Sequence, residues 1–249
     1  MVLGIILGEG LIIKMKKILL ITGQAGSGKT TLANRLMEKM DAEKESFAKI
    51  LKTITFSILK SSLCKDVDYN VNDLVYGTDD QKSTTLRIDL DCPKRILMVK
   101  SIWMTFILDY DIDYELFEPT VNILLDCLKS KDVTSRKIMQ IIGTEIIRDH
   151  ISVKFHTEML INRIRFNDND NDTFIIDDYR FPNEYDLLKD VEEFTVKAIH
   201  LDCISENVHT HRSETEDLFS DVRFTLERGT YLDEKYDPVI ISLLEDDNE

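Results

Sequence analysis

The hydrophobic pattern first predicts a buried strand over residues Lys17–Thr22, a short apolar run that ends at a glycine. Residues 23–30 are rich in glycine and therefore predict a loop. Beyond that loop, apolar residues recur with the spacing of an amphipathic helix, at Leu32, Ala33, Leu36, Met37 and Met40. A strand, a glycine-rich loop and a helix in this order are typical of the start of an α/β domain.

Three later stretches have a mostly helical pattern. They cover residues 47–59, 94–128 and 134–164, and we expect two helices in the last of them. The second stretch contains Trp103, the only tryptophan, and is rich in large apolar residues. No chemistry is visible there, so we assign it to packing in the core or in a subdomain.

Further strands are predicted at residues 174–176, 193–201 and 239–241. Asparagine and aspartate alternate over residues 167–172, which predicts a turn; this run lacks the glycine and the closing glutamate of a calcium-binding EF-hand loop. Strands separated by helices imply a largely parallel sheet that is covered on both faces.

The N-terminal residues 1–13 are apolar but too short for a membrane span, and Glu9 interrupts them. The lysines follow this run, whereas those of a signal peptide precede it. We therefore expect residues 1–14 to be a dispensable extension. Residues 15–249 then form one domain, with a helical insert over about residues 60–130.

Composition narrows the possible functions. The chain has 249 residues, 43% of them hydrophobic, so it can build a core and is not a disordered protein. Its net charge of -15 disfavours binding to duplex nucleic acid, unless basic residues gather in one cleft. Four cysteines without C-x-x-C spacing argue against a zinc ribbon or a dithiol site. We expect a cytoplasmic protein with reduced thiols.

The glycine-rich loop matches G-x-x-x-x-G-K-[ST] in full and predicts a P-loop. Its glycines let successive N–H groups face phosphate oxygens, and the following helix presents its positive end to the same anion. We expect Lys29 to reach the β- and γ-phosphates and Thr30 to ligate Mg²⁺. The predicted nucleotide-binding residues are Gly23, Gln24, Ala25, Gly26, Ser27, Gly28, Lys29, Thr30 and Thr31.

Two adjacent acids, Asp177 and Asp178, follow the strand at residues 174–176. One of them can hold the magnesium shell, and we select Asp178, acting through water. Arg180 can neutralise a phosphoryl group during its transfer. The alternative use of two acids at this position is a helix cap or a turn.

The segment Asp178–Glu184 resembles the D-x-R-F-P-N-E motif of phage-type deoxynucleoside monophosphate kinases. Ser46–Lys52 is similar to the F-A-x-x-L-K segment of that family, and His211–Glu214 to its late H-x-S-E. A further block, R-x-x-x-Q-x-x-G-T-E-x-x-R, matches Arg136, Gln140, Gly143, Thr144, Glu145 and Arg148. These segments occur in the family's order over about residues 15–241.

A kinase for a monophosphate holds two polyanions and needs cations besides that of the P-loop. The resemblance offers Lys52, Arg136, Arg148 and Arg180. An α-helix would bring Gln140, Thr144 and Arg148 to one face, and Gln140 or Glu145 could recognise a base edge or a sugar hydroxyl. The resemblance also places His211, Ser213 and Glu214 near the substrate or the nucleotide. His209 and His211 could instead bind zinc, but no third ligand is evident.

These observations together predict a P-loop NTPase fold with a helical substrate or lid subdomain. The predicted reaction transfers the γ-phosphoryl group of ATP to a deoxynucleoside monophosphate with Mg²⁺. Its catalytic residues are Lys29, Arg148, Asp178 and Arg180. A kinase similar to the animal-type phosphomevalonate kinases and an ATP-gated interaction module are the alternatives. We expect no membrane or duplex nucleic acid as a partner, and a homodimer is left open.

Overall fold

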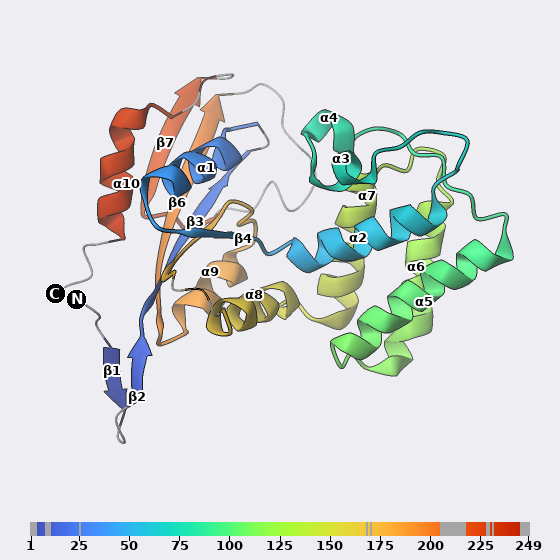
Figure 1. Cartoon of the computed structure of the whole chain (residues 1–249), viewed down its shortest axis with the longest axis horizontal. Coiled ribbons are helices and arrows are strands. Elements are labelled where there is room, and N and C mark those ends of the chain that lie inside the picture. Colours follow the sequence, from blue (N-terminus) through green and yellow to red (C-terminus); the bar gives the residue numbers. More distant parts are fainter. Residues whose placement is uncertain are drawn as a thin grey trace. The chain divides into compact units, whose positions relative to one another are not determined.

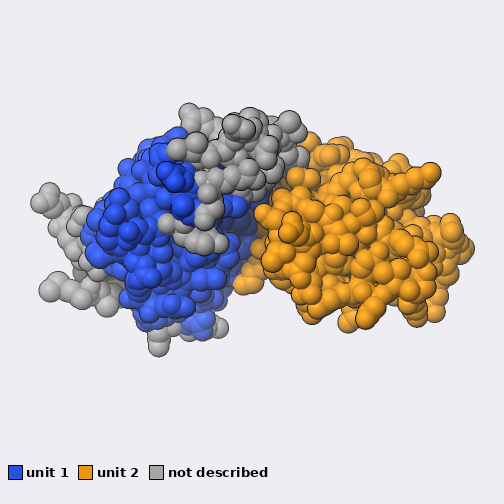
Figure 2. Space-filling model, turned by 90° about the horizontal axis from the view of Figure 1, so that it is seen from above, with its two compact units in different colours: residues 1–47, 157–249 blue, residues 48–156 orange. Residues whose placement is uncertain are grey.

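A computed structural model describes residues 4–7, 11–24, 26–167, 169, 171–204, 218–227, 230 and 232–244 of the chain. The chain divides into two compact units, which Figure 2 colours separately. Unit 1 comprises Met1–Phe47 and Thr157–Glu249, and unit 2 comprises Ala48–His156. Within the described residues, no helix is both long and apolar enough to cross a membrane.

Unit 1 is built on a five-stranded sheet in the order β4-β5-β3-β6-β7, in which every neighbouring pair is parallel. The central strand β3 pairs with β5 on one side and with β6 on the other. Because the strands are parallel, their carboxyl ends lie along one edge of the sheet. The strands are β3 (Lys16–Gly23), β4 (Glu43–Glu45), β5 (Thr173–Ile176), β6 (Phe194–Ile204) and β7 (Val222–Glu227).

Helices cover both faces of this sheet (Figure 1). On one face, α1 (Lys29–Lys39) and α10 (Asp237–Leu243) bury apolar side chains against β3, β5 and β6. On the other, α8 (Phe155–Arg165) and α9 (Pro182–Lys189) pack on the same strands. This architecture confirms the predicted parallel sheet and is that of a P-loop NTPase-like α/β fold.

Unit 2 is helical. Trp103 is fully buried and donates a hydrogen bond from Nε1 to Thr120 Oγ1 at 2.8 Å, so the predicted core role of the tryptophan is confirmed. The helices are α2 (Lys49–Ser62), α3 (Val71–Tyr76), α4 (Asp79–Lys82), α5 (Pro93–Asp109), η1 (Tyr114–Leu116), α6 (Phe117–Leu128), α7 (Ser135–Gln140) and the π-helix η2 (Ile141–Ile151).

The predicted strand at residues 239–241 is wrong, because these residues lie in α10. Pro238 lies in the first turn of that helix, and an apolar run of three residues has no period that distinguishes a strand from a helix. The short strand β4 and the strand β7 were not predicted. Near the N-terminus, β1 (Gly4–Leu7) and β2 (Leu11–Lys14) form an antiparallel pair, and the dispensability of residues 1–14 stays a prediction.

Candidate active site

The glycine-rich loop, residues 23–30, leaves the carboxyl end of β3 and leads into α1. Gly23 must be a glycine, because a Cβ there would lie 2.3 Å from the Leu201 carbonyl oxygen of β6. Gly26 and Gly28 have φ angles of +78° and +87°, which L side chains rarely adopt. Open space lies beside Gly26, where a Cβ would meet nothing within 4 Å among the described atoms. The backbone of the loop is thus accessible to a bound group.

Lys29 is the first residue of α1, and its ammonium lies over the loop itself. Its Nζ donates hydrogen bonds to the carbonyl oxygens of Gly23, at 2.7 Å, and of Gln24, at 2.6 Å. Thr30 and Thr31 follow in the first turn and are exposed. Gly28 is the N-cap of the helix and has no side chain with which to cap it. The positive end of α1 and the Lys29 charge therefore meet at the loop.

The two aspartates after β5 lie toward opposite faces of the sheet. Asp177 follows Ile175 on the face that α1 covers, and its Oδ2 lies 2.7 Å from Lys44 Nζ. Asp178 instead accepts hydrogen bonds from Ser46 Oγ, at 2.6 Å, and from the Phe47 N–H, at 3.0 Å. Asp178 therefore holds the backbone between β4 and α2. The sequence analysis selected Asp178 for the magnesium shell, and that assignment stays a prediction. Asp177 is the alternative, because it follows a residue on the sheet face that α1 covers.

Much of the D-x-R-F-P-N-E segment builds the turn between β5 and α9. Pro182 starts α9, where its missing N–H costs nothing. Glu184 is 3% exposed, and its Oε2 accepts hydrogen bonds from the backbone N–H groups of Arg180, at 2.8 Å, and Phe181, at 3.1 Å. This capping fixes the backbone from which the Arg180 side chain extends.

A buried ion pair beside this turn was not predicted from the sequence. Glu45, which is 4% exposed, lies 3.1 Å from Arg163 Nε on α8. Arg163 Nη2 also donates to the Ser46 carbonyl oxygen at 2.7 Å. Ser46 is thus held by Arg163 and by Asp178. A three-residue strand of charged residues has no hydrophobic pattern, so the sequence did not predict the roles of Lys44 and Glu45.

Magnesium fits the residues present at the loop. A hydroxyl and carboxylates are the hard oxygen ligands that Mg²⁺ prefers, and Thr30 and the two aspartates supply them. The buried Ser27 hydroxyl has no hydrogen-bond partner among the described residues. Together with the open space beside Gly26, this unsatisfied group indicates room for a polar ligand at the loop. Among the described residues there is no cluster of three or more metal-ligating His, Cys, Asp or Glu side chains.

In unit 2, α7 runs on into η2, so the expected α-helix becomes a π-helix over Ile141–Ile151. π-helices are rare and are often found at functional sites. A π-helix has more than four residues in each turn. Residues four positions apart therefore still lie on one side of the helix. Each is rotated slightly backward about the helix axis, whereas in an α-helix each is rotated slightly forward. Along this run, Thr144 is partly buried, Glu145 is exposed and Arg148 is 9% exposed.

Arg136 has an acidic partner within unit 2. Its Nη2 lies 2.5 Å from Asp79 Oδ1, at the start of α4. Gln140 and Lys52 are partly buried on α7 and α2. Gly143 allows α2 and η2 to pack closely, because a Cβ there would lie 3.0 Å from a Leu51 methyl group.

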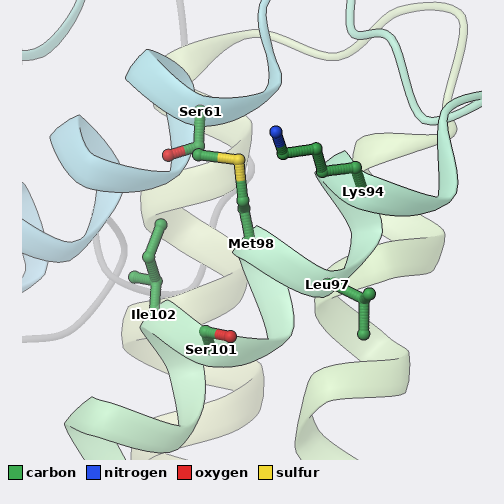
Figure 3. A pocket seen from close by; sticks show the side chains of 6 residues that line it. All are labelled: Ser61, Lys94, Leu97, Met98, Ser101 and Ile102. Carbon is green, nitrogen blue, oxygen red and sulfur yellow. The ribbon is translucent and has the colours of Figure 1, made fainter.

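Figure 3 shows a pocket of about 330 Å³ in unit 2, between α2 and α5. None of the predicted site residues lines it; the lining residues are Ser61, Lys94, Leu97, Met98, Ser101 and Ile102. Ala25, His209, His211, Ser213 and Glu214 lie outside the described residues.

The structure thus places the predicted residues in two groups. Unit 1 places the glycine-rich loop after β3 beside the end of β5, the strand that precedes Asp177 and Asp178. Unit 2 places Arg136, Gln140, Thr144, Glu145 and Arg148 along one continuous helical run.

Two comparisons with known proteins identify the family of this chain. The family model for deoxynucleotide monophosphate kinase matches residues 17–222. A protein of Acanthamoeba polyphaga mimivirus is 25% identical over 205 residues, which are 79% of this chain and 79% of that protein. Its name assigns it, provisionally, to the same kinases. Because the match covers most of the chain and contains both the glycine-rich loop and the D-x-R-F-P-N-E segment, this protein belongs to the deoxynucleotide monophosphate kinase family.

Proposed function

We propose that this chain transfers the γ-phosphoryl group of ATP to a deoxynucleoside 5′-monophosphate, giving the diphosphate and ADP. The observation that carries the proposal is the glycine-rich loop, whose backbone is open beside Gly26 and whose lysine lies at the positive end of α1. Such a loop binds the phosphates of a nucleoside triphosphate. Family membership supports the choice of a deoxynucleoside monophosphate as the acceptor.

On the donor side, the N–H groups of the loop bind the phosphate oxygens, and Lys29 exchanges its carbonyl partners for the β- and γ-phosphates. Thr30 and Asp177 are the residues we assign to Mg²⁺, with Asp178 as the original candidate. When bound, this ion neutralises phosphate charge and orients the γ-phosphoryl group. Lys29 and Arg180 stabilise the charge that spreads over the transferring group.

On the acceptor side, we assign the monophosphate to the basic and polar residues of unit 2. Arg148 and Arg136 offer guanidinium groups that can hold a phosphate through two hydrogen bonds each. Arg136 would then exchange Asp79 for the phosphate. Lys52, Gln140, Thr144 and Glu145 complete the group, together with His211, Ser213 and Glu214, which the family resemblance adds.

Phosphoryl transfer of this kind asks for positioning and charge neutralisation rather than a covalent nucleophile. The assigned residues fit that demand, because they are mostly cations and hydrogen-bond donors. An acidic chain with a net charge of -15 can still bind two polyanions if these cations gather at the reacting phosphates.

The test uses purified protein, Mg-ATP and a panel of dTMP, dGMP, dCMP, dAMP, their ribonucleotides and phosphomevalonate. Products are identified by mass, and Lys29→Ala serves as the blank because it loses a cation that stabilises the transferring group. A deoxynucleoside diphosphate formed in equal amount with ADP supports the proposal and defines the base preference. ATP binding without transfer to any acceptor refutes it.

A matched pair of variants tests the assignment of the two aspartates. Asp177→Asn should lower kcat by orders of magnitude and change its dependence on the Mg²⁺ concentration. Asp178→Asn removes a carboxylate that binds Ser46 and Phe47, so it should lower thermal stability and leave the Mg²⁺ dependence unchanged. If Asp178→Asn changes the Mg²⁺ dependence and Asp177→Asn does not, Asp178 is the residue that holds the metal.

A further inference from the structure

Two cations on the outer side of α1 meet one buried carboxylate at the start of α10. Asp237, which is 1% exposed, accepts a hydrogen bond from Arg35 Nη2 at 2.6 Å through Oδ1. Its Oδ2 accepts one from Lys39 Nζ at 2.7 Å. Hydrogen bonds to Asp237 and then to Glu234 raise the pKa of Lys39 above its ordinary value. Both oxygens of the Asp237 carboxylate thus accept hydrogen bonds from α1, the helix that follows the glycine-rich loop.

The same helix is tied to the residues just before Asp237. Arg35 Nη1 donates to the Leu232 carbonyl oxygen at 2.7 Å. Apolar side chains complete the contact, because Leu232, Ile240 and Leu244 share one core cluster with residues of α1. We call residues 232–244 the C-terminal strap. It lies outside residues 17–222, which the family model matches.

The two kinds of contact constrain α1 differently. Apolar burial of Leu32, Ala33 and Leu36 holds the helix on the sheet, but burial is non-directional and tolerates small slides and rotations. The hydrogen bonds of Arg35 and Lys39 to one buried carboxylate are directional and short. They fix how far α1 can slide and rotate over the sheet.

A movement of α1 where it contacts the strap also displaces the N-terminal end of α1, which follows the glycine-rich loop. Arg35 lies five residues after Thr30, which corresponds to about 7.5 Å along the helix axis. An α-helix of this length moves as a rigid body, so a slide or rotation at Arg35 moves the Lys29 and Thr30 groups by a similar amount. Groups that hold a reacting phosphate tolerate displacements of only a fraction of an ångström before their contribution falls.

We propose that the C-terminal strap sets the affinity of this enzyme for its phosphoryl donor, with Asp237 as a positioning residue that fixes the loop helix through Arg35 and Lys39. The inference rests on the proposed binding of ATP at the glycine-rich loop. Asp237 touches neither substrate and acts through α1. It therefore influences the donor side and leaves the acceptor side unchanged.

The experiment compares Asp237→Asn with Glu234→Gln as a matched control. Glu234 also forms an ion pair with Lys39, at 3.0 Å, but its side chain is 72% exposed. Among the described residues, Glu234 forms no ion pair with Arg35. Asparagine keeps the shape of Asp237 but loses its charge, so the partly buried Arg35 and the exposed Lys39 lose their shared anionic partner. Should Asp237→Asn fail to fold, Arg35→Lys keeps the charge and removes the forked contact to Leu232 and Asp237.

Two readouts separate positioning from mere stability, and both are taken well below the unfolding temperature of each variant. The first is the Kd of Mg-ATP by calorimetry, together with the KM of the monophosphate. The second is hydrogen exchange of the backbone amides of residues 26–31 in the ligand-free chain. We expect Asp237→Asn to weaken ATP binding about tenfold and to speed exchange at residues 26–31. The acceptor KM should stay within about twofold, and Glu234→Gln should match the wild type.

A lower unfolding temperature with unchanged Kd and unchanged exchange at residues 26–31 would overturn the inference, because the strap would then only stabilise the fold. The outcome is distinct from a failure of the proposed function. If the wild type binds Mg-ATP but phosphorylates no acceptor, the kinase proposal fails while the Kd and the exchange rates still decide the role of Asp237. If the wild type binds no nucleotide, there is no donor affinity for the strap to set, and the inference fails together with the proposed function.

Discussion

Replacing Glu184 by alanine tests whether the D-x-R-F-P-N-E segment is mainly a structural device. The Glu184 carboxylate is buried and accepts two backbone hydrogen bonds, from Arg180 and Phe181. Alanine leaves both N–H groups without that acceptor at the start of α9. The change removes an interaction that holds the turn, and it removes no group that we assign to the reaction.

The magnitude follows from these two hydrogen bonds. A hydrogen bond to a charged group contributes about 1.5–3 kcal/mol, so two contribute about 3–6 kcal/mol. Water that enters the space left by the side chain recovers part of this. We therefore expect Glu184→Ala to lower the free energy of unfolding by about 3 kcal/mol, and Tm by about 6–12 °C for a chain of this size. Glu184→Gln keeps one acceptor oxygen and should cost about 1 kcal/mol.

The assay is thermal unfolding followed by circular dichroism, with kinase activity measured at a temperature where each variant is folded. Asp186→Ala is the control, because Asp186 is an exposed acid on the same helix. Loss of Arg180 positioning should lower kcat in Glu184→Ala, and Glu184→Gln should recover most of it. An unchanged Tm with activity abolished in both variants would refute the structural reading and place Glu184 in the chemistry itself.

Three further predictions concern other parts of the chain. Arg148→Lys keeps a charge but loses the forked donor, so we expect the acceptor KM to rise about tenfold in steady-state kinetics while calorimetry gives an unchanged Kd for ATP. Burial raises the pKa of Cys127 from 9.0 to about 11, so peptide mass spectrometry should find the exposed Cys92 alkylated in the native protein and Cys127 only after unfolding. The unfolded thiol ionises first as pH rises, so Tm should fall between pH 9 and about 11, and less so in Cys127→Ala. Deleting residues 1–14 should leave Tm and kcat unchanged, and an insoluble or inactive product would contradict that prediction.

The parts of the fold that the sequence predicted are those with a local cause. Strand β3 is a continuous apolar run, the glycine-rich loop needs left-handed backbone at Gly26 and Gly28, and α1 has the period of an amphipathic helix. Each of these signals is contained within a few residues. The same holds for β5, which is buried throughout, has three apolar residues and is followed by two acids.

The parts that escaped prediction depend on distant partners. Strand β4 consists of three charged residues, and Glu45 is buried only because Arg163, 118 residues later, supplies its counter-charge. Residues 239–241 form a helix, although their short apolar run is equally compatible with a strand. Pro238 in the first turn and the packing of Ile240 in the core cluster that contains α1 residues favour the helix. The apolar pattern of the π-helix η2 is compatible with both an α-helix and a π-helix, so the spacing of its apolar residues could not predict which one forms.

The paired acids at the carboxyl edge of the sheet explain how an acidic chain can form a site for polyanions. Glu45 is paired with Arg163, Asp177 with Lys44, and Glu184 accepts two backbone N–H groups. Asp178 likewise accepts hydrogen bonds from a hydroxyl and from a backbone N–H. Each carboxylate that this edge requires for its own construction therefore has a positive or polar donor beside it, which offsets its repulsion of a phosphate. The sign of the potential at the loop is then decided by Lys29 and the end of α1 rather than by the net charge of the chain.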